Sequence, residues 1–182
     1  MRVTVDQCDP TGKIARLSNS SRVNLHLFVY GSLKIGECND HVLKKWVREF
    51  RVARTRGEMR LRPDNYPALF LQEAEILGTE DYATDFRLST APELTEGHEI
   101  EGQLLVLQGP LEMLRALDDF EGYFPGRPSE YLRVALSVRT ELGLEPCWTY
   151  TGVGAPRTDW EPIGFWPPPH LNMKPEPYHH GL

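Results

Sequence analysis

The sequence predicts an α+β fold, a small mixed or antiparallel β-barrel with flanking helices. Several short stretches alternate apolar and polar residues with the period of two that is typical of strands, whereas only two stretches have helical spacing. The predicted order is strand, helix, strands, a long loop, strand, helix and hairpin. Helices therefore do not alternate regularly with strands, as they would in a parallel α/β fold.

The first predicted strand covers residues 25–30, where apolar side chains recur at every second position. A turn bracketed by Gly31 and Gly36 follows, and an amphipathic helix then begins, with Asn39 or Asp40 as its cap. The apolar face of this predicted helix consists of Val42, Leu43, Trp46, Val47 and Phe50.

A strand, a glycine turn and a helix N-terminus together form a generic anion-binding cradle, because the turn leaves backbone N–H groups free. The same arrangement is also a common connection without any binding role. A P-loop is excluded, because Glu37 and Cys38 stand where Lys and Ser or Thr would hold phosphate and Mg²⁺. The three closely spaced glycines of a dinucleotide site are also missing.

The remaining elements follow from local patterns. One or two strands are predicted between residues 50 and 61, and further strands at 66–71, 100–107, 132–139 and 147–153. Residues 63–65 form a turn, and Gly143 turns the final hairpin. A short amphipathic helix covers residues 111–117, with Pro110 as its first residue and Gly122 in the left-handed conformation that closes it.

Composition divides the chain into three parts. Residues 1–24 are a polar N-terminal extension, and residues 25–154 form the domain. Within the domain, the acidic and weakly patterned stretch 72–99 is expected to be a long surface loop or insertion. Residues 155–182 are a proline-rich C-terminal tail without regular elements, extended or wrapped over the domain through its large aromatic residues Trp160, Phe165 and Trp166.

Composition also excludes several classes of function. The net charge of −6 disfavours nucleic acid and anionic membranes as partners. No apolar run approaches the ~20 residues of a membrane helix, and the N-terminus does not resemble a secretory signal, so a cytoplasmic location is expected. Cys8, Cys38 and Cys147 are far apart and the histidines are scattered, so we predict neither a disulfide framework nor a metal site.

The second helix ends in three carboxylates, Asp118, Asp119 and Glu121, which face the unfavourable end of the helix dipole. Glu121 lies between Phe120 and Tyr123, and burial among aromatic rings would raise its pKa from ~4.3 toward neutrality. Such a carboxyl group suits general acid–base work. An acidic helix end is, however, also common on solvated surfaces.

Six short motifs occur along the chain: Tyr30-Gly31-Ser32-Leu33-Lys34, Tyr66-Pro67-Ala68, Glu101-Gly102, Leu117-Asp118-Asp119-Phe120-Glu121-Gly122-Tyr123, Tyr131-Leu132-Arg133 and Trp148-Thr149-Tyr150. In their order and spacing, from about Leu25 to Val153, the chain resembles the gamma-glutamylcyclotransferase-like family. The opening Tyr-Gly-Ser-Leu with the later Leu-Asp-x-x-Glu-Gly-Tyr and Tyr-x-Arg is the specific part. Both tails and the acidic stretch lie outside the resemblance.

The resemblance implies a small β-barrel and a pocket whose first loop holds the α-amino-acid end of a γ-glutamyl group. It implies that Glu121 is the catalytic acid/base. The predicted substrate-binding residues are Tyr30, Gly31, Ser32, Leu33 and Tyr131. Three aromatic residues are assigned to core packing and stay outside the predicted site: Tyr66, Trp148 and Tyr150.

The implied chemistry agrees with the residues present. In a γ-glutamyl amide, the substrate's own α-amine attacks the γ-carbonyl, closes a five-membered ring and gives 5-oxoproline and a free amine. Intramolecular attack supplies effective molarities on the order of 10⁵ M or more. The reaction therefore needs no protein nucleophile, metal or cofactor, and backbone N–H groups of the first loop can serve the substrate carboxylate or the developing oxyanion.

Three alternatives stay open. The leaving group could be an amino acid, a lysine-type amine or a small metabolite, and the acidic stretch and the tail could favour a cationic one. The fold could instead serve as a non-catalytic small-molecule-binding module, since fold does not fix function. A structural role with the proline-rich tail as a ligand is the third. The sequence leaves the oligomeric state undetermined.

Overall fold

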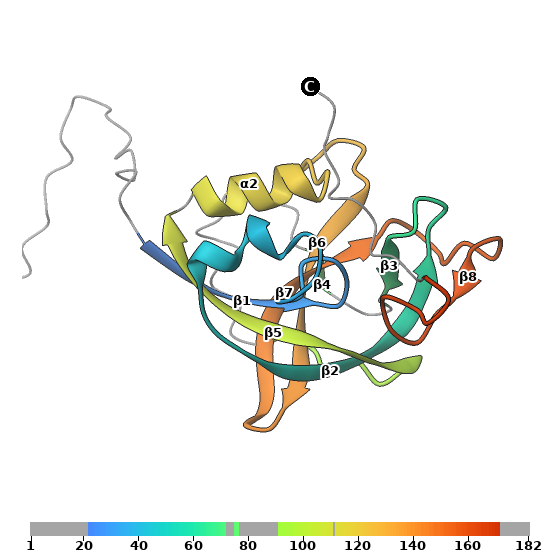
Figure 1. Ribbon diagram of the computed structural model, residues 1–182, viewed down its shortest axis with the longest axis horizontal. Coiled ribbons are helices and arrows are strands. Elements are labelled where there is room, and N and C mark those ends of the chain that lie inside the picture. Colours follow the sequence, from blue (N-terminus) through green and yellow to red (C-terminus); the bar gives the residue numbers. More distant parts are fainter. Residues whose placement is uncertain (1–21, 72–74, 77–90, 111, 172–182) are drawn as a thin grey trace, which may run out of the picture.

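The computed structural model describes residues 22–71, 75–76, 91–110 and 112–171 (Figure 1). Its elements are, in chain order, β1 (Arg22–Val29), the 3₁₀ turns η1 (Asp40–Val42) and η2 (Lys44–Trp46), β2 (Val47–Leu61), β3 (Pro67–Phe70), β4 (Glu75–Ile76), β5 (His98–Pro110), α2 (Glu112–Phe120), β6 (Tyr131–Thr140), β7 (Gly143–Gly152) and β8 (Glu161–Pro162). The predicted N-terminal extension lies almost wholly outside the described residues.

Five strands form a closed mixed barrel in the order β2-β5-β1-β7-β6. The last strand returns to the first, since Arg54 of β2 pairs with Arg139 of β6. Strands β1 and β7 run parallel, and the other neighbouring pairs run antiparallel. Helix α2 lies across one side of this barrel, with the 3₁₀ turns between it and β1 (Figure 1). The predicted α+β barrel is confirmed.

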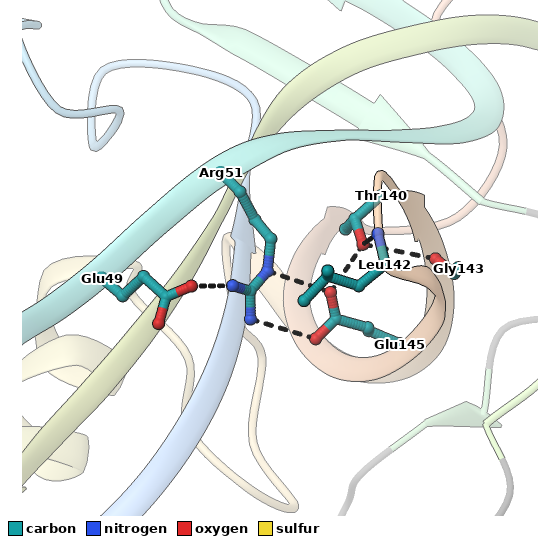
Figure 2. A network of polar contacts seen from close by, with 6 residues as sticks. All are labelled: Glu49, Arg51, Thr140, Leu142, Gly143 and Glu145. Atoms are coloured by element: carbon teal, nitrogen blue, oxygen red, sulfur yellow. Dashed lines mark hydrogen bonds and ion pairs between the residues drawn. The ribbon is translucent and has the colours of Figure 1, made fainter.

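An ion pair joins β2 to β7 where the barrel closes (Figure 2). The guanidinium of Arg51 donates two hydrogen bonds to the carboxylate of Glu145, at 3.0 and 3.2 Å, and it also contacts Glu49. Thr140 of β6 donates its hydroxyl to the same Glu145 carboxylate at 2.6 Å. Partial burial opposes these donors, yet the pKa of Glu145 remains below its ordinary value. Side chains from three strands are thereby linked at this seam.

The interior of the barrel is filled from alternate positions of its strands. In the second half of β2, the side of the strand that faces inward is buried at every second residue from Ala53 to Leu61. One apolar cluster fills the space between the barrel and α2, and it includes Leu27, Leu105, Leu114 and Leu117. This packing fixes the C-terminal end of α2 against the barrel.

The predicted first helix is wrong. Residues Asp40 to Trp46 form only two short 3₁₀ turns, and Val47 to Phe50 already belong to β2. Of the five residues on the predicted apolar face, only Leu43 is fully buried, and Phe50 is 49% exposed. The β-branched Val47 and the aromatic Phe50 suit a strand, and their pairing with β5 decides the conformation of this segment.

The second helix is confirmed, with a different start. Pro110 is the last residue of β5 and is not a helical residue. At the other end, Gly122 has a φ of 60°, the left-handed conformation predicted for it. The N–H of Tyr123 then donates to the carbonyl of Asp118 at 2.8 Å, which closes the helix.

Two irregular stretches contain more structure than predicted. The acidic stretch 72–99 includes β4, which pairs with β6, and its last residues belong to β5. Residues 72–74 and 77–90 lie outside the described part. The proline-rich segment contains β8, a two-residue strand that pairs with the end of β2. Pro162 is tolerated there because β8 lies at an edge, where a missing donor costs little.

Candidate active site

One cavity brings together most of the residues singled out in the sequence. It encloses about 650 Å³, including the space at its mouth, beside the end of β1 and the end of α2. Its lining includes all six predicted site residues, Tyr30, Gly31, Ser32, Leu33, Glu121 and Tyr131. It also includes residues that were not predicted, namely Asn39, Arg62, Asp64, Tyr66, Glu130 and Tyr150.

The loop that follows β1 forms one wall of the cavity. The N–H of Lys34 donates to the carbonyl of Gly31 at 3.1 Å, which makes a tight turn. Within the described residues, the N–H groups of Ser32 and Leu33 have no hydrogen-bond acceptor. Gly31 is required here, because a Cβ atom would lie 2.6 Å from Cγ of Pro67. The loop thus contains two backbone donors without an acceptor, next to a position where only glycine fits against Pro67.

Asn39 holds this loop in place through two hydrogen bonds to Ser32. Its N–H donates to the carbonyl of Ser32 at 3.0 Å, and its Nδ2 donates to Oγ of Ser32 at 3.0 Å. Further along, the N–H of Ile35 donates to Oε1 of Gln103 at 2.7 Å. Asn39 was predicted as a helix cap, but its side chain bonds back to the loop and caps neither 3₁₀ turn.

Glu121 is the first residue after α2, and its backbone N–H closes the last helical turn by donating to Leu117. The residue is partly buried, and it lines the cavity. Desolvation of its carboxyl group raises its pKa from an ordinary value of 4.5 to about 8. The positive charge of Arg62 opposes this rise, and the nearby carboxylates of Glu130 and Asp118 add to it. A carboxyl group with this pKa can both take up and return a proton near neutral pH.

Arg62 is the cation of this site. It forms ion pairs with Asp64 at 2.9 Å and with Glu130 at 3.4 Å. Its guanidinium also lies 5.4 Å from the centre of the Tyr131 ring. Arg62 therefore connects two carboxylates at the rim of the cavity with the aromatic wall next to Glu121.

The two predicted tyrosines line the cavity, but their hydroxyl groups bond to the backbone of β3 and β7. Tyr30 donates to the carbonyl of Tyr150 at 2.9 Å and accepts from the N–H of Leu69 at 3.3 Å. Tyr131 donates to the carbonyl of Pro67 at 3.1 Å. Burial raises the pKa of both phenols, so they stay protonated. Their rings shape the cavity, while the hydroxyl of Tyr30 joins the end of β1 to β3 and β7, and the hydroxyl of Tyr131 joins β6 to β3.

Comparison with known proteins now identifies the fold and the family. The family model described as "Gamma-glutamyl cyclotransferase, AIG2-like" matches residues 27–94 and 82–166. The chain belongs to this family. The resemblance found in the sequence is thereby confirmed, and membership supports a cyclotransferase-type function with a small-molecule substrate. No curated protein sequence matches the chain.

Two crystal structures are similar in fold to this protein. An aig2-like protein from Mus musculus superposes with a TM-score of 0.56 at 23% identity, over 87% of this chain and 99% of that one. YkqA from Bacillus subtilis gives a TM-score of 0.51 at 21% identity, over 79% of this chain. The match spans only 40% of the length of YkqA. At these identities the two structures support the fold alone.

The three carboxylates at the end of α2 have separate roles in this family member. Asp118 is only 4% exposed, and it forms an ion pair with the fully buried Arg133 at 2.5 Å. The hydroxyl of Tyr150 donates to the same carboxylate at 2.6 Å. Asp119 is exposed. Asp118 is therefore structural, Asp119 is exposed and Glu121 lines the cavity.

The C-terminal segment connects two walls of the cavity. Nζ of Lys34 donates to the carbonyl of Trp166 at 2.6 Å, and Nε1 of Trp166 donates to the carbonyl of Asn65 at 2.9 Å. The ring of Trp166, which is 1% exposed, stacks on Tyr66 with 6.3 Å between ring centres. This segment thus fixes the loop after β1 and the turn before β3 relative to each other.

Two further properties concern the described residues as a whole. No three His, Cys, Asp or Glu side chains among them lie close enough together to bind a metal ion. None of their helices has the length and apolar character needed to cross a bilayer.

Proposed function

We propose that this protein is a γ-glutamyl cyclotransferase that releases an amine or amino acid from a γ-glutamyl amide and forms 5-oxoproline. One observation carries the proposal. A desolvated carboxyl group, Glu121, lines the same cavity as Ser32 and Leu33, whose backbone N–H groups have no acceptor among the described residues. A base next to a set of fixed donors is what this cyclisation requires.

The donors of the first loop would hold the α-carboxylate of the substrate. Backbone N–H groups that point into a cavity bind carboxylates without needing a cationic side chain. Arg62 faces the same cavity, and it provides positive charge while it remains paired to Asp64 and Glu130. The substrate would then curl with its γ-carbonyl near its own α-nitrogen, the arrangement that favours intramolecular attack.

Glu121 would transfer one proton during the reaction. The neutral α-amine attacks the γ-carbon and forms the new C–N bond, and the carboxylate of Glu121 takes one proton from the attacking nitrogen. The tetrahedral intermediate collapses when the bond to the leaving nitrogen breaks, and Glu121 returns the proton to that nitrogen. The products are 5-oxoproline and a free amine, and the carboxylate is regenerated.

A test of this proposal begins with a panel of substrates. The purified protein is incubated with γ-glutamyl amino acids, γ-glutamyl amines and glutathione, and 5-oxoproline is detected by mass spectrometry. We expect release from at least one class, which then identifies the leaving group, and no release by Glu121→Gln. Asp119→Asn is the matched control, because it changes an exposed carboxylate on the same helix end.

The result also separates the enzyme from a binding module on the same fold. Binding of γ-glutamyl compounds without any 5-oxoproline would refute the cyclotransferase and support the module. Full activity in Glu121→Gln would refute the assignment of the base.

A further inference from the structure

Asn39 has an unpaired polar atom in the wall of the cavity. Its side chain is fully buried, at 0% exposure, and it lines the cavity. Its Oδ1 has no hydrogen-bond partner within the described residues. Buried side-chain acceptors in proteins are nearly always paired, so an unpaired one in a cavity wall points to a ligand that pairs with it.

Asn39 forms two hydrogen bonds to Ser32: its N–H donates to the carbonyl and its Nδ2 donates to Oγ, at 3.0 Å each. Its Oδ1 is the polar atom that has no partner among the described residues. Thr55 also has a buried hydroxyl without a partner among the described residues, but it does not line the cavity. Asn39 combines a buried acceptor that has no partner among the described residues with a place in the wall of the site.

We propose that Oδ1 of Asn39 accepts a hydrogen bond from the α-amine of the substrate, and thereby selects γ-glutamyl compounds whose α-amine is free. This inference rests on the function proposed above. An open acceptor requires a donor, and a γ-glutamyl amide has two: its α-amine and the amide N–H of the leaving group. The carboxylate binds next to Ser32, the residue that Asn39 holds, and the α-amine is one carbon from that carboxylate.

The consequence for catalysis is positional. The α-amine would be held between two acceptors, Oδ1 of Asn39 and the carboxylate of Glu121. Only Glu121 takes a proton, and Asn39 keeps the remaining N–H directed away from the γ-carbon. The lone pair of the amine is then free to attack that carbon. Asn39 is on this account a substrate-binding residue that sets specificity.

Two probes separate this role from a structural one. The first is γ-glutamyl methylamide, and the second is N-methylglutaramic acid, which lacks only the α-amine. Both are titrated calorimetrically into the full chain carrying Glu121→Gln, so that no turnover interferes. We expect Asn39→Leu to weaken binding of the first probe by about 10- to 100-fold, the loss of a hydrogen bond to a charged donor. Binding of the second probe should change by less than about threefold.

Two further variants complete the comparison. Asn39→Asp keeps an oxygen at this position, and it should retain the preference for the probe with the amine. This variant also serves if Asn39→Leu does not fold. Ser32→Ala removes the bond to Nδ2 but leaves Oδ1, so it should weaken both probes to a similar extent.

The outcomes are distinct. Equal weakening of both probes in Asn39→Leu would overturn the inference, since Asn39 would then only hold the loop. Loss of the preference in Asn39→Asp would overturn it as well. If the Glu121→Gln chain binds neither probe, this inference fails, whereas the proposed function is decided separately by the release of 5-oxoproline from the substrate panel.

Discussion

Replacing Glu121 with Gln should make the protein more stable, and the gain should grow with pH. The carboxyl group has an ordinary pKa of 4.5 and a pKa of about 8 in the folded chain, values about 3.5 pH units apart. Between these values the folded state keeps a proton that the unfolded state has lost. The contribution of Glu121 to the free energy of unfolding is therefore fully present below pH 4.5, and it is lost as the pH rises through about 8.

The magnitude follows from the same two values. Each pH unit corresponds to ~1.4 kcal/mol, so the upper limit is ~5 kcal/mol. Glu121 is only partly buried and water reaches the cavity, so we expect about 2 to 4 kcal/mol. Gln has a similar shape and no charge, so the variant is free of this cost. A carboxyl group whose ionised form lowers the stability of the fold is typical of active sites, where stability is given up for activity.

The assay is urea unfolding of the native chain and of Glu121→Gln at pH 5 and pH 8.5. The variant should match the native chain within ~1 kcal/mol at pH 5 and exceed it by about 2 to 4 kcal/mol at pH 8.5. Asp119→Asn, which changes an exposed carboxyl group on the same helix end, is the control, and it should change the free energy of unfolding by less than ~0.5 kcal/mol. An equal difference at both pH values, or a native chain that gains stability relative to the variant, would refute the reasoning.

Three further substitutions test the walls of the site. Gly31→Ala should destabilise the fold by about 1 to 3 kcal/mol and weaken substrate binding, because its Cβ would meet Pro67 at 2.6 Å. Arg133→Met should cost about 3 to 5 kcal/mol in urea unfolding, because it leaves the buried Asp118 without its cation. Trp166→Ala should cost about 3 to 5 kcal/mol and raise KM more than it lowers kcat, because it frees two walls of the cavity.

Each of these variants has a matched control. Gly164→Ala adds a Cβ where nothing lies within 4 Å, and it should be neutral. Arg127→Met removes an exposed arginine, and Phe165→Ala removes a ring that is 53% exposed. If a control costs as much as its partner, the specific contact is not the cause. If Trp166→Ala changes stability but leaves KM unchanged, the C-terminal segment does not position the cavity.

The strands could be predicted because their pattern is local. Alternation along β6 and β7, the turn at Gly143 and the closure of α2 at Gly122 all depend on residues close in sequence. The first helix could not be predicted correctly, since the apolar residues around Phe50 fit a helix by spacing. Only the pairing of β2 with a strand far along the chain shows that they form a strand.

The candidate site could be predicted in part for the same reason. The loop after β1 and Glu121 belong to short motifs, and the structure brings them into one cavity. The role of Arg62 depends on a contact with a residue far away in sequence, and no local pattern indicates it. The aromatic residues of the tail allowed packing on the domain to be predicted, but not the bonds by which Trp166 joins the loop after β1 to the turn before β3. Likewise, Asp118 and Glu121 look alike in the sequence, and only the buried Arg133 distinguishes them.

The central claim is that Glu121 transfers the proton in a cyclisation that forms 5-oxoproline. The most direct measurement is the single-turnover rate of 5-oxoproline formation at pH 8, with saturating substrate, for the native chain and for Glu121→Gln. We predict a loss of about 10²-fold to 10⁴-fold in the variant, the usual contribution of a general base. Rates that agree within about threefold, at equal occupancy of the site, would contradict the claim.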